Sequence, residues 1–145
     1  MAISNILTQL PITLATITTG NGYQTTVKTV FKVEKLPKDV EVSKCPALAY
    51  TWINAPRAEF DESVDTFSLF FAIIGYVEVA TDLAEEGTVQ LALAKLYEDV
   101  VKLFNDGTTA FSKLDEVEDV QVIDGFPESS GNKGWIYIPI KIDYK

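Results

Sequence analysis

The 145-residue sequence contains no histidine and only one cysteine. Because histidine is absent, the chain cannot supply a Ser-His-Asp or Cys-His catalytic set, nor most kinds of zinc site. The single Cys45 excludes a disulfide within the chain and indicates synthesis in a reducing compartment. No apolar run reaches the roughly 18 residues of a membrane span, and the first residues lack the basic start of a signal peptide. We therefore expect synthesis in the cytoplasm and no membrane partner.

Arginine is also scarce. Arg57 is the only arginine among 12 basic residues, which stand against 21 acidic residues and leave a net charge of −9. Recognition of phosphates and base edges favours arginine forks set in a basic patch. The sequence therefore predicts no specific nucleic-acid binding. An acidic surface also repels a polyanion, so that DNA can pass along it without sticking.

Apolar residues, in contrast, are plentiful. They make up 47% of the chain, and no low-complexity tract interrupts them. A chain of this length can bury roughly 70% of the surface that its unfolded state exposes, which is enough for one core without disulfides or metal. We find no internal repeat and no linker, and we predict one domain over residues 1–145.

Three segments have the composition of β-strands. Residues 23–33 are rich in threonine, valine and aromatic side chains, and residues 47–53 form a second such run after Pro46. Residues 67–79 are apolar at both parities, which is typical of a central strand covered on both faces. The second cover of this strand must come from a helix of this chain or from another subunit.

The N-terminal segment has helical spacing. Apolar residues recur at steps of three and four between Ile3 and Ile17. Pro11 lies inside this pattern and can break or kink a helix. We predict a short helix near residues 3–10 and leave open whether residues 15–19 are extended.

A longer helix is predicted in the second half of the chain. Asp82-Leu83-Ala84-Glu85 has the form of a helix start, but Gly87 lowers helicity, so the helix is expected from about residue 88. Asn105-Asp106-Gly107 supplies its stop. Its apolar stripe consists of Val89, Leu93, Leu96, Val100 and Leu103, widened by Tyr97 and Phe104.

The C-terminal third predicts two further strands. Residues 117–123 form a short one, residues 124–133 have a loop composition, and residues 135–144 alternate isoleucine with polar or aromatic residues. Pro139 cannot donate to a strand ladder, which suggests an edge position or a bulge. The fold class is therefore α+β: a mainly antiparallel sheet with one principal helix packed across it and a short N-terminal helix.

Candidate chemical sites are few. Two acidic clusters contain oxygen ligands suited to Ca²⁺ or Mg²⁺, but neither has the spacing of a calcium-binding loop, so we interpret them as solvated acids. Cys45 is interpreted as a structural thiol, and Gly20-Asn21-Gly22 as a turn. We nominate no catalytic, cofactor-binding or metal-ligating residue, expect no cofactor, and predict that the chain is not an enzyme. The clusters are Glu59, Asp61, Glu62 and Asp65, and Asp115, Glu116, Glu118 and Asp119.

Six aromatic residues raise the possibility of a base-stacking platform. Such platforms come with cationic grooves, and the acidic background argues against that use. We interpret these side chains as packing in the core and at subunit interfaces. They are Tyr50, Trp52, Tyr76, Trp135, Tyr137 and Tyr144.

The order of the pieces resembles the tail terminator and minor tail proteins of tailed bacteriophages. Those proteins open with a short helix and then a Gly-Tyr-x-Thr turn, as at Gly22-Tyr23-Gln24-Thr25 here. A Pro-Ala-Leu strand follows, here Pro46 to Tyr50, and then an acidic loop and a long apolar strand. A helix of the Leu-x-x-Leu-x-x-Asp-Val type comes next, here Leu93 to Val100, and an alternating strand closes on Tyr144.

The resemblance implies a structural virion protein. Members of such families form hexameric rings that cap the polymerised tail tube, end its polymerisation and provide the docking face for the head connector. The implied partners are copies of the chain itself, the tail tube protein and the head–tail connector protein, and the implied location is the virion tail or neck. The resemblance carries over no catalytic residues.

The residues themselves suggest how such a ring is held. We expect sheet edges and the loops at 54–65 and 124–134 to make contacts between subunits and between rings, with DNA passing through an acidic lumen. Two other readings stay open. One is another neck or tail protein, such as a head–tail joining, tail completion or tail-tube protein. The other is a small cytoplasmic ligand-binding or adaptor domain.

Overall fold

The computed structural model describes residues 2–54, 67–79, 88–109, 111–115 and 117–144. A six-stranded sheet forms the centre of the molecule, with strand order β1-β2-β3-β6-β4 and with β5 also paired to β6. The predicted α+β class is confirmed. The helices are α1 (Ala2–Leu14) and α2 (Thr88–Asn105), and the strands are β1 (Thr29–Phe31), β2 (Ala47–Asn54), β3 (Phe67–Glu78), β4 (Val117–Val122), β5 (Phe126–Ser130) and β6 (Lys133–Tyr144).

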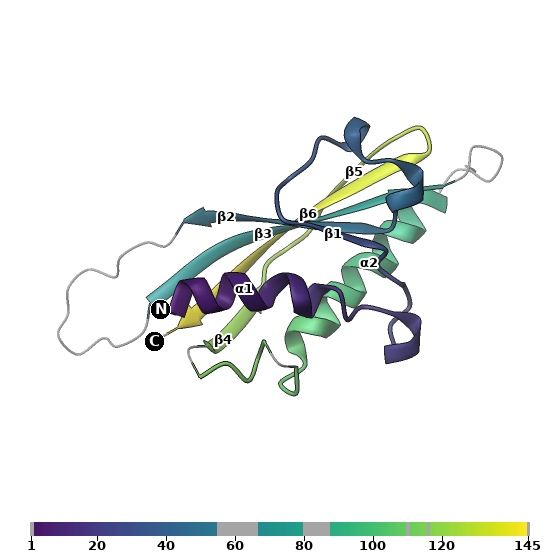
Figure 1. Ribbon diagram of the computed structural model, residues 1–145. Helices are drawn as coiled ribbons and strands as arrows, with labels where there is room; N and C mark the ends of the chain where they lie inside the picture. The colour runs from purple at the N-terminus through teal and green to yellow at the C-terminus, as the bar shows by residue number, and fades with distance from the viewer. Residues whose placement is uncertain (1, 55–66, 80–87, 110, 116, 145) are drawn as a thin grey trace.

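Both α-helices lie on one face of the sheet (Figure 1). On that face, large side chains from β3 and β6 meet Leu10 of α1 and Leu96 of α2 in the main hydrophobic core. The opposite face carries a second and smaller core of Val40, Cys45 and alanines from β2 and β3. We call these the helix face and the second face.

β3 is the central strand, as predicted. It pairs with β2 on one side and, over its whole length, with β6 on the other. Residues 71–77 are all buried, because alternate side chains enter the two cores. The cover that this chain supplies on the second face is not a helix of the predicted kind. It is the segment 32–46, which contains the short 3₁₀ helices η2 (Pro37–Asp39) and η3 (Val42–Lys44).

Glycines in the strands let α2 lie close to the sheet. A Cβ added at Gly75 of β3 would come within 2.7 Å of Leu96 Cδ2, and one added at Gly134 of β6 would come within 2.6 Å of Val89 Cγ1. A larger residue at either position would have to displace the helix. The short distance between α2 and the sheet therefore depends on the two glycines at positions 75 and 134.

The predicted edge position of Pro139 is wrong, because β6 is an interior strand between β3 and the β4–β5 side. The Pro139 carbonyl accepts a hydrogen bond from the Ile123 N–H at 2.9 Å. Since the N–H and C=O of one residue in an antiparallel strand point to the same side, the missing N–H of Pro139 faces the gap between β4 and β5. A proline is tolerated there because the acceptor that its N–H would have served, the carbonyl of the opposed Ile123, belongs to an exposed residue at the end of β4 that water can reach.

Two other strand predictions need correction. The strand expected at 23–33 is reduced to Thr29–Phe31, and it pairs with β2 in parallel. The loop expected at 124–133 contains β5, which forms a hairpin with β6 through Gly131 and Asn132. Gly131 has φ +62°, and glycine is favoured at the first central position of such a two-residue turn.

The helix predictions hold with one extension. α2 begins at Thr88 and ends at Asn105, as expected from Gly87 and the following stop. α1 covers the predicted residues 3–10 and continues through Pro11 to Leu14. The Ile17 side chain is fully buried although it follows the helix, so the apolar spacing outlasts the helix itself.

Candidate assembly surface

The sheet has an open edge on each side. On one side, β1 pairs only with Ala47–Ala49 of β2, and residues 50–54 of β2 have no outer neighbour in the part of the chain that the structure describes. On the other side, β4 and β5 share the outer flank of β6, and neither has an outer partner among those residues. We call these the β1–β2 edge and the β4–β5 edge. An unpaired strand edge presents N–H and C=O groups that can template another chain.

The two edges lie on opposite sides of the sheet, and their strands occupy matching positions along its length. The register runs in one row from Thr29 through Ala47, Tyr76 and Trp135 to Glu128. At the other end of the sheet, a second row runs from Trp52 through two interior strands to Val122. β5 therefore lies level with β1, and β4 lies level with the unpaired part of β2.

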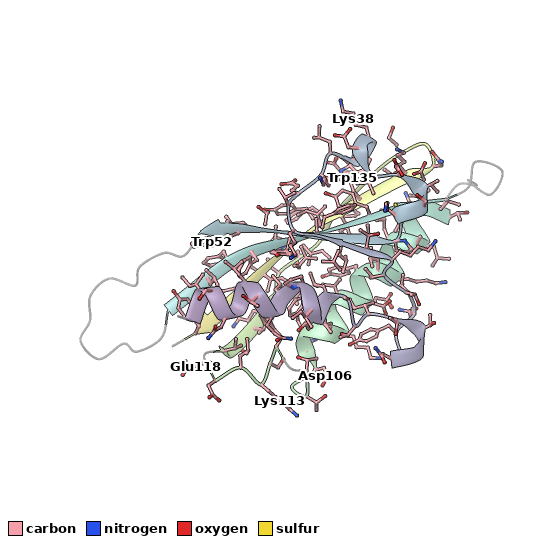
Figure 2. The ribbon with its side chains drawn as sticks, in the orientation of Figure 1. Lys38, Trp52, Asp106, Lys113, Glu118 and Trp135 are labelled. Atoms are coloured by element: carbon pink, nitrogen blue, oxygen red, sulfur yellow. The ribbon has the colours of Figure 1, made fainter. Side chains whose placement is uncertain are left out.

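Large apolar side chains are exposed at both edges. At the β1–β2 edge, Trp52 is 49% exposed and Ile53 is 46% exposed, and Figure 2 shows Trp52 at the end of β2. At the β4–β5 edge, Phe126 is 58% exposed and Ile123 is 41% exposed. Trp and Phe are enriched at protein interfaces. Apolar exposure therefore coincides with unpaired backbone on both sides of the sheet.

The chain leading into β1 is anchored to α2. The carboxylate of Asp99 is only 2% exposed, and its Oδ1 accepts the Gln24 backbone N–H at 3.0 Å. Lys102 Nζ donates to the Gly22 carbonyl at 2.6 Å and lies 4.8 Å from the centroid of the Tyr23 ring. These contacts replace the predicted strand pairing of residues 23–28 and hold β1 in a fixed place.

One tyrosine of β3 binds the segment 32–46 that covers the second face. The Tyr76 hydroxyl donates to the Lys35 carbonyl at 2.6 Å and accepts the Lys35 N–H at 2.9 Å. Burial raises the pKa of Tyr76, the Lys35 N–H lowers it less, and the nearby Glu34 raises it further. The neutral hydroxyl is therefore the form that the fold favours.

Cys45 lies in the same cover. Its thiol is buried, its Sγ lies 3.6 Å from the Glu41 carbonyl oxygen, and burial together with the charge of Glu78 raises its pKa. A thiol with a raised pKa is a poor nucleophile. The geometry agrees with the structural role predicted for this cysteine.

The acidic candidates that the structure describes do not converge. The first cluster, at 59–65, lies outside the described residues, as does Glu116 of the second. Asp115, Glu118 and Asp119 are exposed at or near β4, and no group of three or more potential ligands gathers among the residues that can be placed.

The six aromatic residues are divided between the two faces. Trp52 and Tyr50 share the parity of the helix face, and Tyr144 packs against the main core there. Tyr76, Trp135 and Tyr137 belong to the second face. Figure 2 places Trp135 on the side of the segment that carries Lys38, away from α1 and α2. The sheet thus separates the six rings into two groups, which makes a single stacking platform impossible.

A groove of about 500 Å³ lies between α2 and β5. Leu93 and Tyr97 of α2, Pro127 of β5 and Ile136 of β6 line it, and a few polar groups lie at its rim. This groove was not predicted, because the composition of residues 124–133 indicated a loop where β5 forms. The signal was present in Gly131-Asn132, a dipeptide that favours a tight hairpin.

The comparisons with known proteins add no family. Neither the models of known protein families nor the curated proteins include a match to this chain. In the described part of the chain, no helix combines the length and the apolar character needed to cross a membrane.

Proposed function

We propose that this chain is a non-enzymatic structural subunit that assembles with copies of itself into a ring, and that the ring is a tail terminator of a tailed bacteriophage. The observation that carries the proposal is the pair of open sheet edges, each with exposed large apolar side chains. Contacts between different patches of identical subunits generate a ring when the rotation closes. A subunit with complementary edges on opposite sides suits that geometry.

The charge of the chain supports the second half of the proposal. A net charge of −9 makes a ring of several copies strongly negative, and a negative channel repels the DNA backbone instead of binding it. In the proposed role the ring, hexameric by resemblance, caps the tail tube and ends its polymerisation. It also offers a docking face to the head–tail connector, and its place is the tail or neck of the virion.

The oligomeric state tests the assembly half directly. Negative-stain electron microscopy of the purified chain over a range of concentrations is expected to reveal closed rings of uniform diameter. A chain that stays monomeric at every concentration would contradict the proposal. Open filaments of variable length would instead favour a tail-tube subunit, since they indicate that the rotation does not close.

The tail half needs a second assay. Purified chain is added to tail tube protein of the same phage during polymerisation, and the tube lengths are measured by electron microscopy. We expect the chain to bind at tube ends and to stop growth. Binding along the sides of tubes, or no effect on length, would favour a head–tail joining or tail completion protein.

The groove between α2 and β5 favours one different function, that of a small ligand-binding domain. Its volume of about 500 Å³ lies within the range of small-molecule sites. A thermal-shift screen of apolar small molecules, with Ala94→Trp in the groove wall as the blocked control, tests it. Stabilisation that the blocked variant loses would support ligand binding over ring assembly.

A further inference from the structure

We infer that neighbouring subunits join head to tail, with the β4–β5 edge of one copy pairing antiparallel to the β1–β2 edge of the next. This inference rests on the proposed ring and names the contact that builds it. Its first support is strand direction. β5 runs antiparallel to β6, β6 to β3 and β3 to β2, whereas β1 runs parallel to β2. β5 is therefore antiparallel to β1, and a copy placed beside another continues the sheet without any strand being reversed.

The apolar side chains of the two edges fall in the same rows. Phe31, at the β1–β2 edge, shares a row with Phe126 at the other edge, through Ala49, Ile74 and Tyr137. A copy added in register therefore brings its Phe126 beside Phe31 of the neighbour. Directly opposed aromatic side chains are among the stabilising cross-strand pairs, and the 58% exposure of Phe126 would be reduced by that contact.

The unpaired part of β2 lies one strand position short of the next copy in this arrangement. Trp52 shares its row with Val122, the last residue of β4. β4 and β5 occupy the same strand position beside β6, whereas β1 lies one strand position outside β2. Pairing β5 with β1 therefore leaves a gap of one strand between β4 of the next copy and residues 50–54 of β2. The 49% exposed Trp52 lies at that gap.

Charge distinguishes this pairing from an edge that pairs with itself. The segment 28–44 holds five lysines and three acids, whereas residues 114–132 hold six acids and no basic residue. Lys28 and Lys32 flank β1 and are exposed, and so are Asp124 and Glu128 on the other edge. When the β1–β5 register is extended, Lys28 falls opposite Ser129 and Lys32 opposite Gly125, each one residue from an acid. Side chains one residue apart point to opposite faces of a strand, so the attraction acts between the two edges as a whole and not between directly opposed pairs. Two β4–β5 edges facing each other would oppose acid to acid.

Charge reversal tests the inference. Lys28→Glu/Lys32→Glu reverses one edge, and Asp124→Lys/Glu128→Lys reverses the other. We expect each variant alone to need a several-fold higher concentration for half-assembly, because a contact between edges of opposite charge becomes a contact between edges of like charge. The fourfold variant that carries both changes exchanges the two signs, and we expect it to assemble close to the level of the unmodified chain.

The control is Lys95→Glu, which reverses one exposed charge on α2, outside both edges. We expect it to assemble normally. Circular dichroism and a thermal melt of every variant establish that the monomers fold, and sedimentation velocity measures assembly. Equal mixing of the two single-edge variants provides a second readout, because a head-to-tail ring then reforms with alternating copies and an even number of subunits.

The outcomes separate the inference from the proposed function. Rings that form normally in both single-edge variants would overturn head-to-tail pairing while leaving the ring proposal standing. Folded single-edge variants that stay monomeric, together with a fourfold variant that is not rescued, would overturn it as well. An unmodified chain that never assembles would overturn both.

Discussion

Within the described residues, the chain covers both faces of the sheet but leaves its edges uncovered. Large aliphatic and aromatic side chains under α1 and α2 fill the helix face, and the segment 32–46 covers alanines and Tyr76 on the second face. The edges have no such cover within the described residues, and they carry Trp52, Ile53, Ile123 and Phe126 at 41–58% exposure. The difference assigns stability to the faces, and our proposal assigns association to the edges. Each prediction below tests that division.

The largest effect is expected in the core of the helix face. Phe71 is fully buried between β2 and β6. Phe71→Ala removes its contacts and leaves a cavity, so we expect a loss of about 3–5 kcal/mol in the free energy of unfolding. Urea denaturation followed by circular dichroism measures it. A loss below about 1 kcal/mol would mean that this core is not as closely packed as described.

The next effect concerns the approach of α2 to the sheet. Gly75→Ala places a methyl group 2.7 Å from Leu96 Cδ2, and we expect overpacking to cost about 1–3 kcal/mol. Gly107→Ala is the matched control, because a Cβ there meets nothing within 4 Å. Denaturation of the two variants side by side makes the comparison. Equal free energies of unfolding for the two variants would show that α2 can shift away from the sheet at no cost.

A smaller effect is expected on the second face. Tyr76→Phe removes both hydrogen bonds to Lys35 and should cost about 0.5–1.5 kcal/mol. The pKa of Tyr76 is raised in the folded chain, so the protonated hydroxyl contributes stability that is fully present below the unfolded value of about 10 and is lost as the pH rises above it.

This gives the same variant a second measurement. We expect the thermal midpoint of the unmodified chain to fall more steeply above pH 10 than that of Tyr76→Phe, because the variant has no hydroxyl to ionise at this position. Parallel pH profiles of the two proteins would show that Tyr76 does not hold the cover of the second face in its neutral form.

The smallest effect on stability, and the largest on association, is expected at an edge. Phe126→Ser should change the free energy of unfolding by no more than about 0.5 kcal/mol, since the side chain is mostly exposed. It should nevertheless reduce assembly. Ile12→Ser is the matched control, because Ile12 is 57% exposed but lies on α1 and not on an edge strand.

The sequence predicted most of the elements whose signals are local. The apolar runs gave β2, β3 and β6, and Gly87 with Asn105-Asp106-Gly107 bounded α2 correctly. Residues 23–28 have strand composition but are not a strand, because Asp99 and Lys102 of α2 bind the backbone of Gln24 and Gly22. Such long-range contacts override local propensity and cannot be read from composition.

The candidate surface was only partly predictable. Sheet edges were expected to make the contacts, but Pro139 directed the prediction to the C-terminal strand, which is interior. The real edges depend on which strands become neighbours, and that order is a property of the whole fold. The β5 hairpin at 124–134 was expected to make contacts as a loop, and it does lie at an edge, as a strand. The other expected contact loop, at 54–65, lies almost wholly outside the described residues.

The central claim is that the folded chain associates through its sheet edges. Native mass spectrometry of the unmodified chain beside Trp52→Ser/Phe126→Ser measures this most directly, because it counts subunits in each species. Our account predicts one closed oligomer for the unmodified chain and a folded monomer for the variant. An oligomer of unchanged copy number in the variant would contradict it.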